Sequence, residues 1–284
     1  MQKTGLVLEG GAKRGIYTAG VLDVFMENNI RFDAVVGVSA GAIHGCSYVS
    51  KQRGRGIRYN LKYNNNYKFM SIRSWLLSGN IVDTQFAYHD LPERLDIYDN
   101  ETFIKSDTQF YVTVSDVVSG NPEYILCKDM FADIDYLRAS ASMPFVSQIV
   151  EVNNKKYLDG GITDSIPLHA CRKLGFTKNV VIATRPQGYR KKAFKHQWLA
   201  KLIYGKYPNF INAMINRHKM YNQEIEQMEK EAEAGNIVLI RPSRFINISK
   251  METNPDIIQD MYNLGRQDAL SILDRIKSFL SCNV

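Results

Sequence analysis

The sequence lacks the long apolar runs of membrane-spanning proteins and the cysteine pairs of small disulfide-bonded domains. No run approaches the roughly 18 to 20 apolar residues that cross a bilayer, and residues 6–8 form the longest one near Met1. The cysteines are Cys46, Cys127, Cys171 and Cys282. They form no C-x-x-C pair and have no histidine at a metal-ligand spacing. We therefore expect a cytosolic protein whose thiols are reduced and mostly buried.

Little in the composition departs from that of an ordinary globular protein. Of the 284 residues, 45% are hydrophobic, 11% aromatic and 23% charged. These values exclude a disordered tail, a collagen-like chain and a coiled coil. The chain has no internal repeat and no linker-like stretch, so we expect a single domain over residues 1–284.

Acidic residues are missing from two long segments. The formal charge is +7, yet residues 51–82 hold seven basic residues and residues 185–219 hold nine, with no acid in either. The remainder of the chain is net acidic, and both tryptophans lie inside these segments. Basic and aromatic residues suit an anionic membrane surface, so segments 51–75 and 185–219 predict peripheral membrane contact. The same features alone would also suit RNA or a plain solvated face.

The first fifty residues alternate strand and helix signals. The apolar run at residues 3–9 predicts a buried strand, and residues 15–28 have apolar side chains at helical spacing. Residues 32–38 predict a second strand, and the small residues from Ala40 onward suit a helix packed closely on a sheet. This β-α-β-α start predicts an α/β fold with a parallel sheet.

Later signals are more varied. Residues 51–91 are basic, aromatic and rich in asparagine, and they predict helices joined by loops. Strands are predicted at 110–115, 124–127, 180–183 and 237–240, with a hairpin at 149–158 that turns at Asn153 and Asn154. Helices are predicted at 130–140, 167–174, 210–233 and, as one or two helices, 256–280.

Residues 37–41, Gly-Val-Ser-Ala-Gly, fit the pattern G-x-S-x-G between a predicted strand and a predicted helix. A serine on so sharp a turn stands clear of the backbone, and Gly37 and Gly41 let the neighbouring segments close up. The helix that begins at Ala40 points its positive end toward an oxyanion. The pattern predicts that Ser39 is a nucleophile, with a simple helix N-cap as the alternative.

A second glycine-rich segment, residues 9–15, joins the first predicted strand to the first helix. In a parallel sheet it lies at the same end as Ser39. Its exposed N–H groups could hold a phosphate or the oxyanion of a tetrahedral intermediate. It is not a dinucleotide-binding loop, because Ala12 replaces the second glycine, and it is not a P-loop, because Ile16 and Tyr17 follow it. The serine turn that comes next favours the oxyanion role.

A nucleophilic serine needs a base. The five histidines are His44, His89, His169, His196 and His218. None lies in a sequence motif that indicates a catalytic base, and the helix after Ser39 would carry His44 away from the hydroxyl. Asp159 is the better candidate for the base. A predicted hairpin precedes it, and Gly160 and Gly161 have no side chains that would block access to its carboxylate. A plain Asp-Gly-Gly turn is the alternative.

Four blocks in this order resemble the patatin-like phospholipases. They are the loop at 9–15, the serine turn at 37–41, the stretch at 139–144 and Asp159-Gly160-Gly161. The resemblance covers roughly residues 4–185 and leaves 186–284 as a helical C-terminal part of uncertain role. It implies a three-layer α/β/α fold with a mainly parallel central sheet.

The resemblance also implies roles for single residues. Ser39 is the nucleophile and Asp159 its sole partner, in a dyad without histidine. Gly10, Gly11 and Ala12 form the oxyanion loop, with Arg14 beside it, while Gly37, Gly41, Gly160 and Gly161 shape the two turns. The family usually has a third glycine where this chain has Ala12, which would be strained there if the position needs a positive φ.

The implied activity is hydrolysis of fatty acyl esters of phospholipids or lysophospholipids, without a metal or cofactor and with no nucleic-acid partner. An aspartate is a weak base, and partial burial should raise its pKa toward usefulness. One alternative is a histidine-triad α/β-hydrolase, although such enzymes place the serine later in the chain. A non-catalytic lipid- or nucleic-acid-binding protein and an acyltransferase that uses the same serine are the others.

Overall fold

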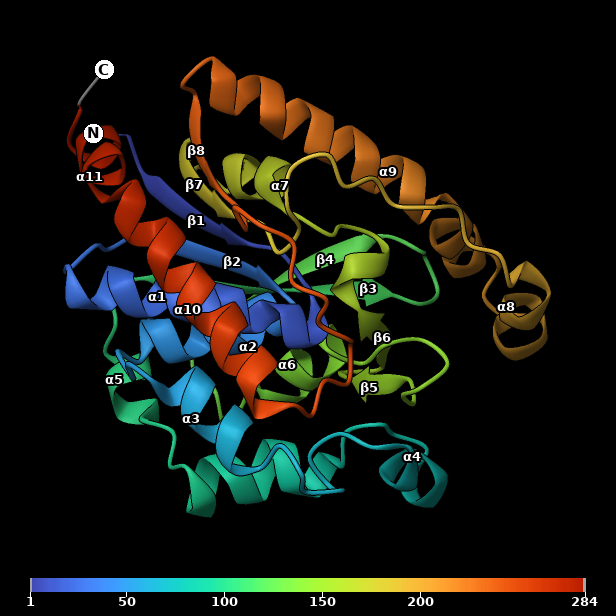
Figure 1. Cartoon of the computed structure of the whole chain (residues 1–284). Helices are drawn as coiled ribbons and strands as arrows, with labels where there is room; N and C mark the ends of the chain where they lie inside the picture. The colour runs from blue at the N-terminus through green and yellow to red at the C-terminus, as the bar shows by residue number, and fades with distance from the viewer. Residues whose placement is uncertain (1, 283–284) are drawn as a thin grey trace.

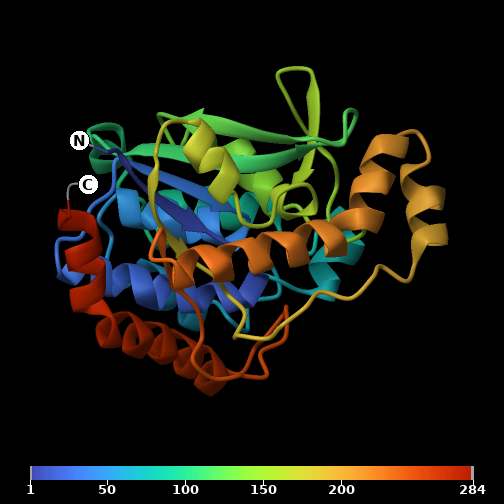
Figure 2. The same ribbon diagram turned by 90° about the horizontal axis from the view of Figure 1, so that it is seen from above.

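The computed structural model describes residues 2–282 and shows a mostly parallel sheet between two layers of helices (Figures 1 and 2). Its eight strands are β1 (Thr4–Leu8), β2 (Ala34–Val38), β3 (Gln109–Asp116), β4 (Pro122–Cys127), β5 (Val150–Val152), β6 (Lys155–Asp159), β7 (Lys178–Ile182) and β8 (Ile237–Ile240). They follow the order β5-β6-β3-β2-β1-β7-β8, and β4 also pairs with β3. The pairings of β2 with β3, β1 with β2, β1 with β7 and β7 with β8 are parallel.

Helices connect and cover these strands. They are α1 (Gly15–Glu27), α2 (Ala40–Val49), α3 (Arg55–Lys62), α4 (Ile72–Ser78), α5 (Asn100–Ile104), α6 (Ile134–Ser140), α7 (Leu168–Lys173), α8 (Gln197–Tyr204), α9 (Pro208–Glu233), α10 (Pro255–Ser271) and α11 (Leu273–Ser281). A π-helix spans Phe86–Leu95. Between residues 2 and 282, no helix combines the length and the hydropathy that a bilayer crossing requires.

The core has two layers because side chains alternate across the sheet. Leu6 and Leu8 of β1 join the larger cluster, which α1, α2 and α10 cover, whereas Val7 joins the cluster beneath α7 and α9. Both clusters consist of almost fully buried apolar side chains, and Figure 1 shows the two helix layers on opposite faces of the sheet. A mostly parallel sheet is therefore protected from water on both faces.

Most predicted elements are confirmed within about two residues, and the differences have local causes. The helix predicted from residue 130 begins at Ile134, because the Asp133 carboxylate accepts the amides of Lys128 and Asp129 and closes a turn first. The short helices α5 and α8 were not predicted. The four cysteines are free, and three of them are buried as expected, whereas Cys282 is exposed.

The C-terminal helix α10 lies directly against α1. A Cβ on Gly265 would stand 2.1 Å from the carbonyl oxygen of Tyr17, and one on Gly20 would stand 2.2 Å from that of Tyr262. The two backbones thus touch where each helix has a glycine. Arg266 adds a two-pronged ion pair to Glu27, with distances of 2.9 and 2.8 Å.

This contact makes a stability prediction. We expect Gly265→Ala to lower the free energy of unfolding by about 1–3 kcal/mol, because the added methyl group forces α10 away from α1. Leu270→Ala, on the same helix but at a half-exposed position, should change it by less than about 0.5 kcal/mol. Urea unfolding measures both, and equal effects would contradict the close packing.

Candidate active site

Ser39 and Asp159 meet because two strands run toward each other along one edge of β3. The parallel strand β2 ends at Val38, opposite Thr113, and the antiparallel strand β6 ends at Asp159, opposite Val114. The residue that follows Val38 therefore lies next to Asp159. The Ser39 hydroxyl donates a hydrogen bond of 2.9 Å to Asp159 Oδ2, and both side chains are buried.

The serine turn is strained and tightly packed. Ser39 has φ 53° and ψ −123°, a conformation that residues other than glycine rarely adopt. A Cβ on Gly37 would lie 2.6 Å from Ala42 Cα, and one on Gly41 would lie 2.5 Å from the Leu8 carbonyl oxygen. These glycines allow the close approach of neighbouring segments that the pattern G-x-S-x-G predicts.

A serine that was not predicted as a site residue fixes this turn. The Ser39 amide donates to the Ser140 hydroxyl at 2.8 Å, and that hydroxyl donates to the Thr113 carbonyl at 2.7 Å. Ser140 is the last residue of α6 and is fully buried. It lies in the stretch 139–144, so the sequence marked the segment but not the role. Ser140 therefore ties the strained turn to β3.

Asp159 is held from several sides. Its Oδ1 accepts the Gly161 amide at 2.8 Å, and its own amide donates to the Ser142 carbonyl at 2.8 Å. A Cβ on Gly160 would stand 2.2 Å from the Thr113 carbonyl oxygen, so this residue must be small. Burial raises the pKa of Asp159, and the nearby Arg217 charge and the hydrogen bonds partly oppose this shift. The carboxylate is thus a stronger base than an exposed aspartate.

The glycine loop lies beside Ser39 with free donors. A Cβ on Gly10 would stand 3.1 Å from Ser39 Cβ. Within residues 2–282, the amides of Gly10, Gly11 and Ala12 donate to no other group. Unpaired amides beside a serine hydroxyl are suited to an oxyanion.

Glu9 anchors this loop, and Ala12 strains it. The buried Glu9 carboxylate accepts the Thr184 amide at 2.5 Å and the Tyr221 hydroxyl at 2.9 Å. Ala12 has φ 49°, so it adopts the left-handed conformation that glycine takes more easily. The position does require a positive φ, and the loop forms with alanine there.

Two cavities meet at Ser39. The first is mainly apolar and extends between α2, α6 and the π-helix; its lining includes Ile16, Ile43, Tyr88, Leu91, Met130 and Leu137. The second is rich in cations and opens toward α9; its lining includes Arg14, Arg185, Lys191 and Arg217. Ser39 and Ala12 line both cavities, and Asp159 lines the second. The Ser39 hydroxyl therefore lies between an apolar cavity and a cation-rich one.

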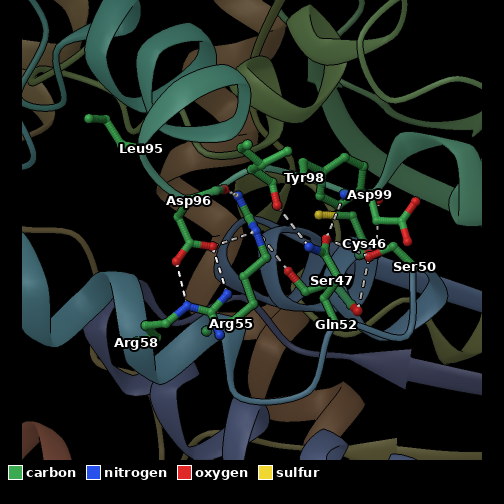
Figure 3. A network of polar contacts seen from close by, with 12 residues as sticks. Cys46, Ser47, Ser50, Gln52, Arg55, Arg58, Leu95, Asp96, Tyr98 and Asp99 are labelled. Carbon is green, nitrogen blue, oxygen red and sulfur yellow. Dashed lines mark hydrogen bonds and ion pairs between the residues drawn. The ribbon is translucent and has the colours of Figure 1, made fainter.

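A buried polar network closes the apolar cavity at Arg55 (Figure 3). Arg55 lies 3.3 Å from Asp96 and donates to the Asp96 carbonyl at 3.1 Å. Arg58 adds two bonds to the Asp96 carboxylate, of 2.6 and 2.9 Å, and Tyr98 donates to the Cys46 carbonyl at 3.0 Å. The network ties α2 and α3 to the segment that follows the π-helix, so it holds the cavity wall in place.

Each basic segment has exposed residues and also contributes cations that face inward. In segment 51–75, Arg55 is buried and paired with Asp96. In segment 185–219, Lys191 and Arg217 line the cavity beside Ser39. Arg217 was missed as a site residue. A signal existed, because Arg217 shares the face of α9 that carries Met214 and Tyr221.

No histidine of the described chain bonds to Ser39 or Asp159. His44 lines the apolar cavity and stacks on Tyr59 at 6.4 Å between ring centroids, and burial, with the Arg55 charge, lowers its pKa to about 3. His218 contacts the Ile215 carbonyl, and His89 contacts Glu93. His196 and His218 line the second cavity together with Ser39, but within the described residues neither forms the hydrogen bond to Ser39 that a histidine triad requires.

Comparisons with known proteins show the family of the chain. Residues 6–172 match the family model of the patatin-like phospholipases, and residues 207–281 match that of a domain of unknown function, DUF6363. The uncharacterized protein YjjU of Escherichia coli K12 is 27% identical over 273 residues, which cover 93% of this chain and 75% of that protein.

Two further relatives have lipid-related names. The probable lipid hydrolase 463L of Invertebrate iridescent virus 6 is 23% identical over 285 residues, which cover 93% of this chain and 87% of that protein. The lysophospholipase NTE1 of Saccharomyces cerevisiae is 25% identical over 179 residues, which cover 61% of this chain but only 10% of that protein.

The buried carboxylate of Asp159 should affect the free energy of unfolding. Because the pKa of Asp159 is raised on folding, its ionisation costs stability at neutral pH. Asparagine could still accept the Gly161 amide with its Oδ1 and could donate from its Nδ2 to the Ser39 hydroxyl, without the charge. We expect Asp159→Asn to have the higher free energy of unfolding at pH 7, and the gain to shrink as the pH falls, because protonation removes the buried charge from the wild type.

Urea unfolding at several pH values measures this difference. Asp107→Asn is a matched control, since Asp107 is exposed and makes no side-chain hydrogen bond in the described structure. Its effect should be small at every pH. An Asp159→Asn protein that is less stable than the wild type at pH 7 would refute the prediction.

Proposed function

The chain belongs to the patatin-like phospholipase family, and from this membership we propose that it hydrolyses fatty acyl esters of phospholipids or lysophospholipids. Ser39 would be the nucleophile and Asp159 the base. The observation that carries the proposal is the 2.9 Å hydrogen bond between these two side chains, beside three unpaired amides. A two-residue mechanism is feasible because a carboxylate, unlike an imidazole, has no tautomer that a third residue must fix.

The proposed acylation step uses this geometry directly. Asp159 takes the hydroxyl proton while Ser39 Oγ forms a bond to the ester carbonyl carbon. The carbonyl oxygen becomes an oxyanion, which the amides of Gly10, Gly11 and Ala12 stabilise. When the carbon–oxygen bond of the alcohol breaks, the leaving alcohol takes the proton from Asp159. Water then hydrolyses the acyl-enzyme by the same route in reverse.

The apolar cavity supports a fatty acyl substrate. It begins at Ser39 and is lined mainly by apolar and aromatic side chains from α2, α6 and the π-helix. Transfer of an alkyl chain into such a lining gains about 0.8 kcal/mol per buried CH2. The position of the cavity beside Ser39 would place the acyl carbonyl near the hydroxyl.

We also propose that residues 1–284 act as one unit. The C-terminal part supplies β8 at the edge of the sheet, α10 against α1, and Tyr221 and Arg217 beside the glycine loop and Asp159. Its role would therefore include completing the site.

Two short helices support contact with a lipid surface. In Figure 1, α4 and α8 project on the side toward which β1 and β2 point. Their exposed apolar side chains are Ile72, Trp75, Leu76 and Leu77 on α4, and Trp198, Leu202 and Ile203 on α8.

These helices also carry cations, and one loop joins them. Arg73 on α4 and Lys201 on α8 are exposed, which suits an anionic lipid layer. In the loop 143–148, the Phe145 amide donates to Tyr204 at the end of α8, and the Gln148 side chain donates to the Ser78 carbonyl of α4. Apolar side chains, with cations around them, would therefore insert beside the entrance to the site.

Loss of the nucleophile should abolish the activity. We expect a fluorophosphonate probe to label the wild type and to leave Ser39→Ala unlabelled, because only an activated hydroxyl reacts. Ser271→Ala, an exposed serine on α10, should label like the wild type.

Asp159→Asn should lose on the order of a thousandfold or more in ester turnover, because Asn cannot accept the proton.

Two outcomes would contradict this proposal. One is equal labelling of the wild type and Ser39→Ala. The other is a loss of turnover comparable to that of Ser39→Ala on replacement of a single histidine, which would revive the histidine-triad alternative.

The two helices make a separate prediction. We expect the double variant Trp198→Ser, Leu202→Ser to bind phosphatidylglycerol vesicles at least about tenfold more weakly than the wild type, because two large apolar side chains are lost. Vesicle sedimentation measures the binding. Leu270→Ser, an exposed apolar position on α10, serves as the control. Equal binding of the two variants would exclude α8 as the membrane contact.

A further inference from the structure

The second cavity at Ser39 has an unusual concentration of cations. Those that line it are Arg14, Arg185, Lys191, Lys192, Lys195, Arg217 and Lys250. They come from the glycine loop, the segment after β7, helix α9 and the segment after β8. We call this space the cationic cavity. Folding brings these cations together from four distant segments of the chain.

Several of these cations have no anionic partner. In the described residues, the side chains of Arg14, Arg185, Lys191 and Arg217 take part in no ion pair or hydrogen bond. The Nε atoms of Arg14 and Arg217 are moreover buried without a partner. Buried donors are normally hydrogen-bonded, so these guanidinium groups favour an anionic ligand.

The acidic residues of the cavity are already engaged. Of the acidic residues that the structure describes, only Glu9 and Asp159 line it. The Glu9 carboxylate accepts bonds from Thr184 and Tyr221, and Asp159 accepts bonds from Ser39 and Gly161. Cations therefore outnumber acids, and the cavity has a net positive charge. Burial, and after it the Arg217 charge, lower the pKa of Lys191 to about 7.

Two aromatic rings of the cavity face cations, and the other two, Phe145 and Phe194, stack on each other at 5.9 Å between ring centroids. The Arg185 guanidinium lies 4.2 Å from the centre of the Tyr189 ring, and Lys191 Nζ lies 4.2 Å from that of Tyr221. A choline or ethanolamine group needs either a free carboxylate or a free ring face. The cationic cavity offers little of either, and its charge repels such a group.

We propose that the cationic cavity binds the phosphate of the alcohol part and makes the protein selective for lipid esters with a net anionic head group. This inference rests on the proposed function. The acyl chain would occupy the apolar cavity, and the head group, on the opposite side of Ser39, would enter among Arg14, Arg185 and Lys191. Phosphoglycerol and phosphomonoester groups fit this charge, whereas phosphocholine and phosphoethanolamine bring a cation into it.

Kinetics on dissolved short-chain lipids tests the selectivity without a membrane. We expect the wild type to cleave dihexanoyl phosphatidylglycerol at least about tenfold better in kcat/KM than dihexanoyl phosphatidylcholine. Arg185→Gln and Lys191→Gln should each reduce this ratio several-fold, mainly through KM for the anionic lipid. Lys219→Gln, an exposed lysine on α9 outside the cavity lining, should keep the wild-type ratio. Equal cleavage of the two lipids would overturn the proposal, as would equal losses on both lipids in the variants.

A binding measurement separates this inference from the proposed function. Calorimetric titration of Ser39→Ala should give at least about tenfold tighter binding of the phosphatidylglycerol than of the phosphatidylcholine, and inorganic phosphate should bind more weakly than the anionic lipid. Phosphate that binds as tightly as that lipid would mean a site for free phosphate and would overturn the head-group assignment. Selective binding, with no ester hydrolysis by the wild type, would leave the inference standing and refute the proposed function.

Discussion

The register of two strands on β3 is the constraint on which the site depends. β2 ends opposite Thr113 and β6 ends opposite Val114, so the residues at their ends are neighbours although 120 positions separate them in the chain. A shift of one residue would turn every side chain of the strand to the other face of the sheet. The register is secure because the side chains on each face are packed in a core layer, so a slipped strand would place side chains of the wrong size in both layers.

The costs of this arrangement gather at one end of the sheet. Ser39 and Ala12 have positive φ, Asp159 is a buried carboxylate, and the cations of the cationic cavity lack partners. Each of these features lowers the stability of the folded protein. Such features persist where the surrounding residues hold them in place. Here the support is specific: Ser140 holds the serine turn, Gly161 and Ser142 hold Asp159, and Glu9 holds the glycine loop. Two buried apolar layers offset these costs.

The C-terminal part contributes to the site as well as to the fold. Residues 207–281 match a domain of unknown function, and within them α9 runs across one face of the sheet (Figures 1 and 2) and lines the cavity at Ser39. Its Tyr221 hydroxyl bonds to Glu9 at the start of the glycine loop, and Arg217 charges the surroundings of Asp159. The match to the patatin-like phospholipases ends at residue 172, so these two contacts add, from outside that region, an anchor for the loop and a positive field near the carboxylate.

The sequence by itself determined the order of strands and helices at the start of the chain, the serine turn, the glycine loop and the Asp-Gly-Gly segment. These features are local, since a strand, a turn or a close approach needs particular residues at particular spacings. It could not reveal that Arg217 and Lys191 lie inside a cavity, that Arg55 pairs with Asp96, or that Ser140 holds the serine turn, although Arg217 on an apolar helix face was a sign. Only the tertiary structure decided these, because the charge or hydroxyl of one segment acquires its role from distant segments that fold against it.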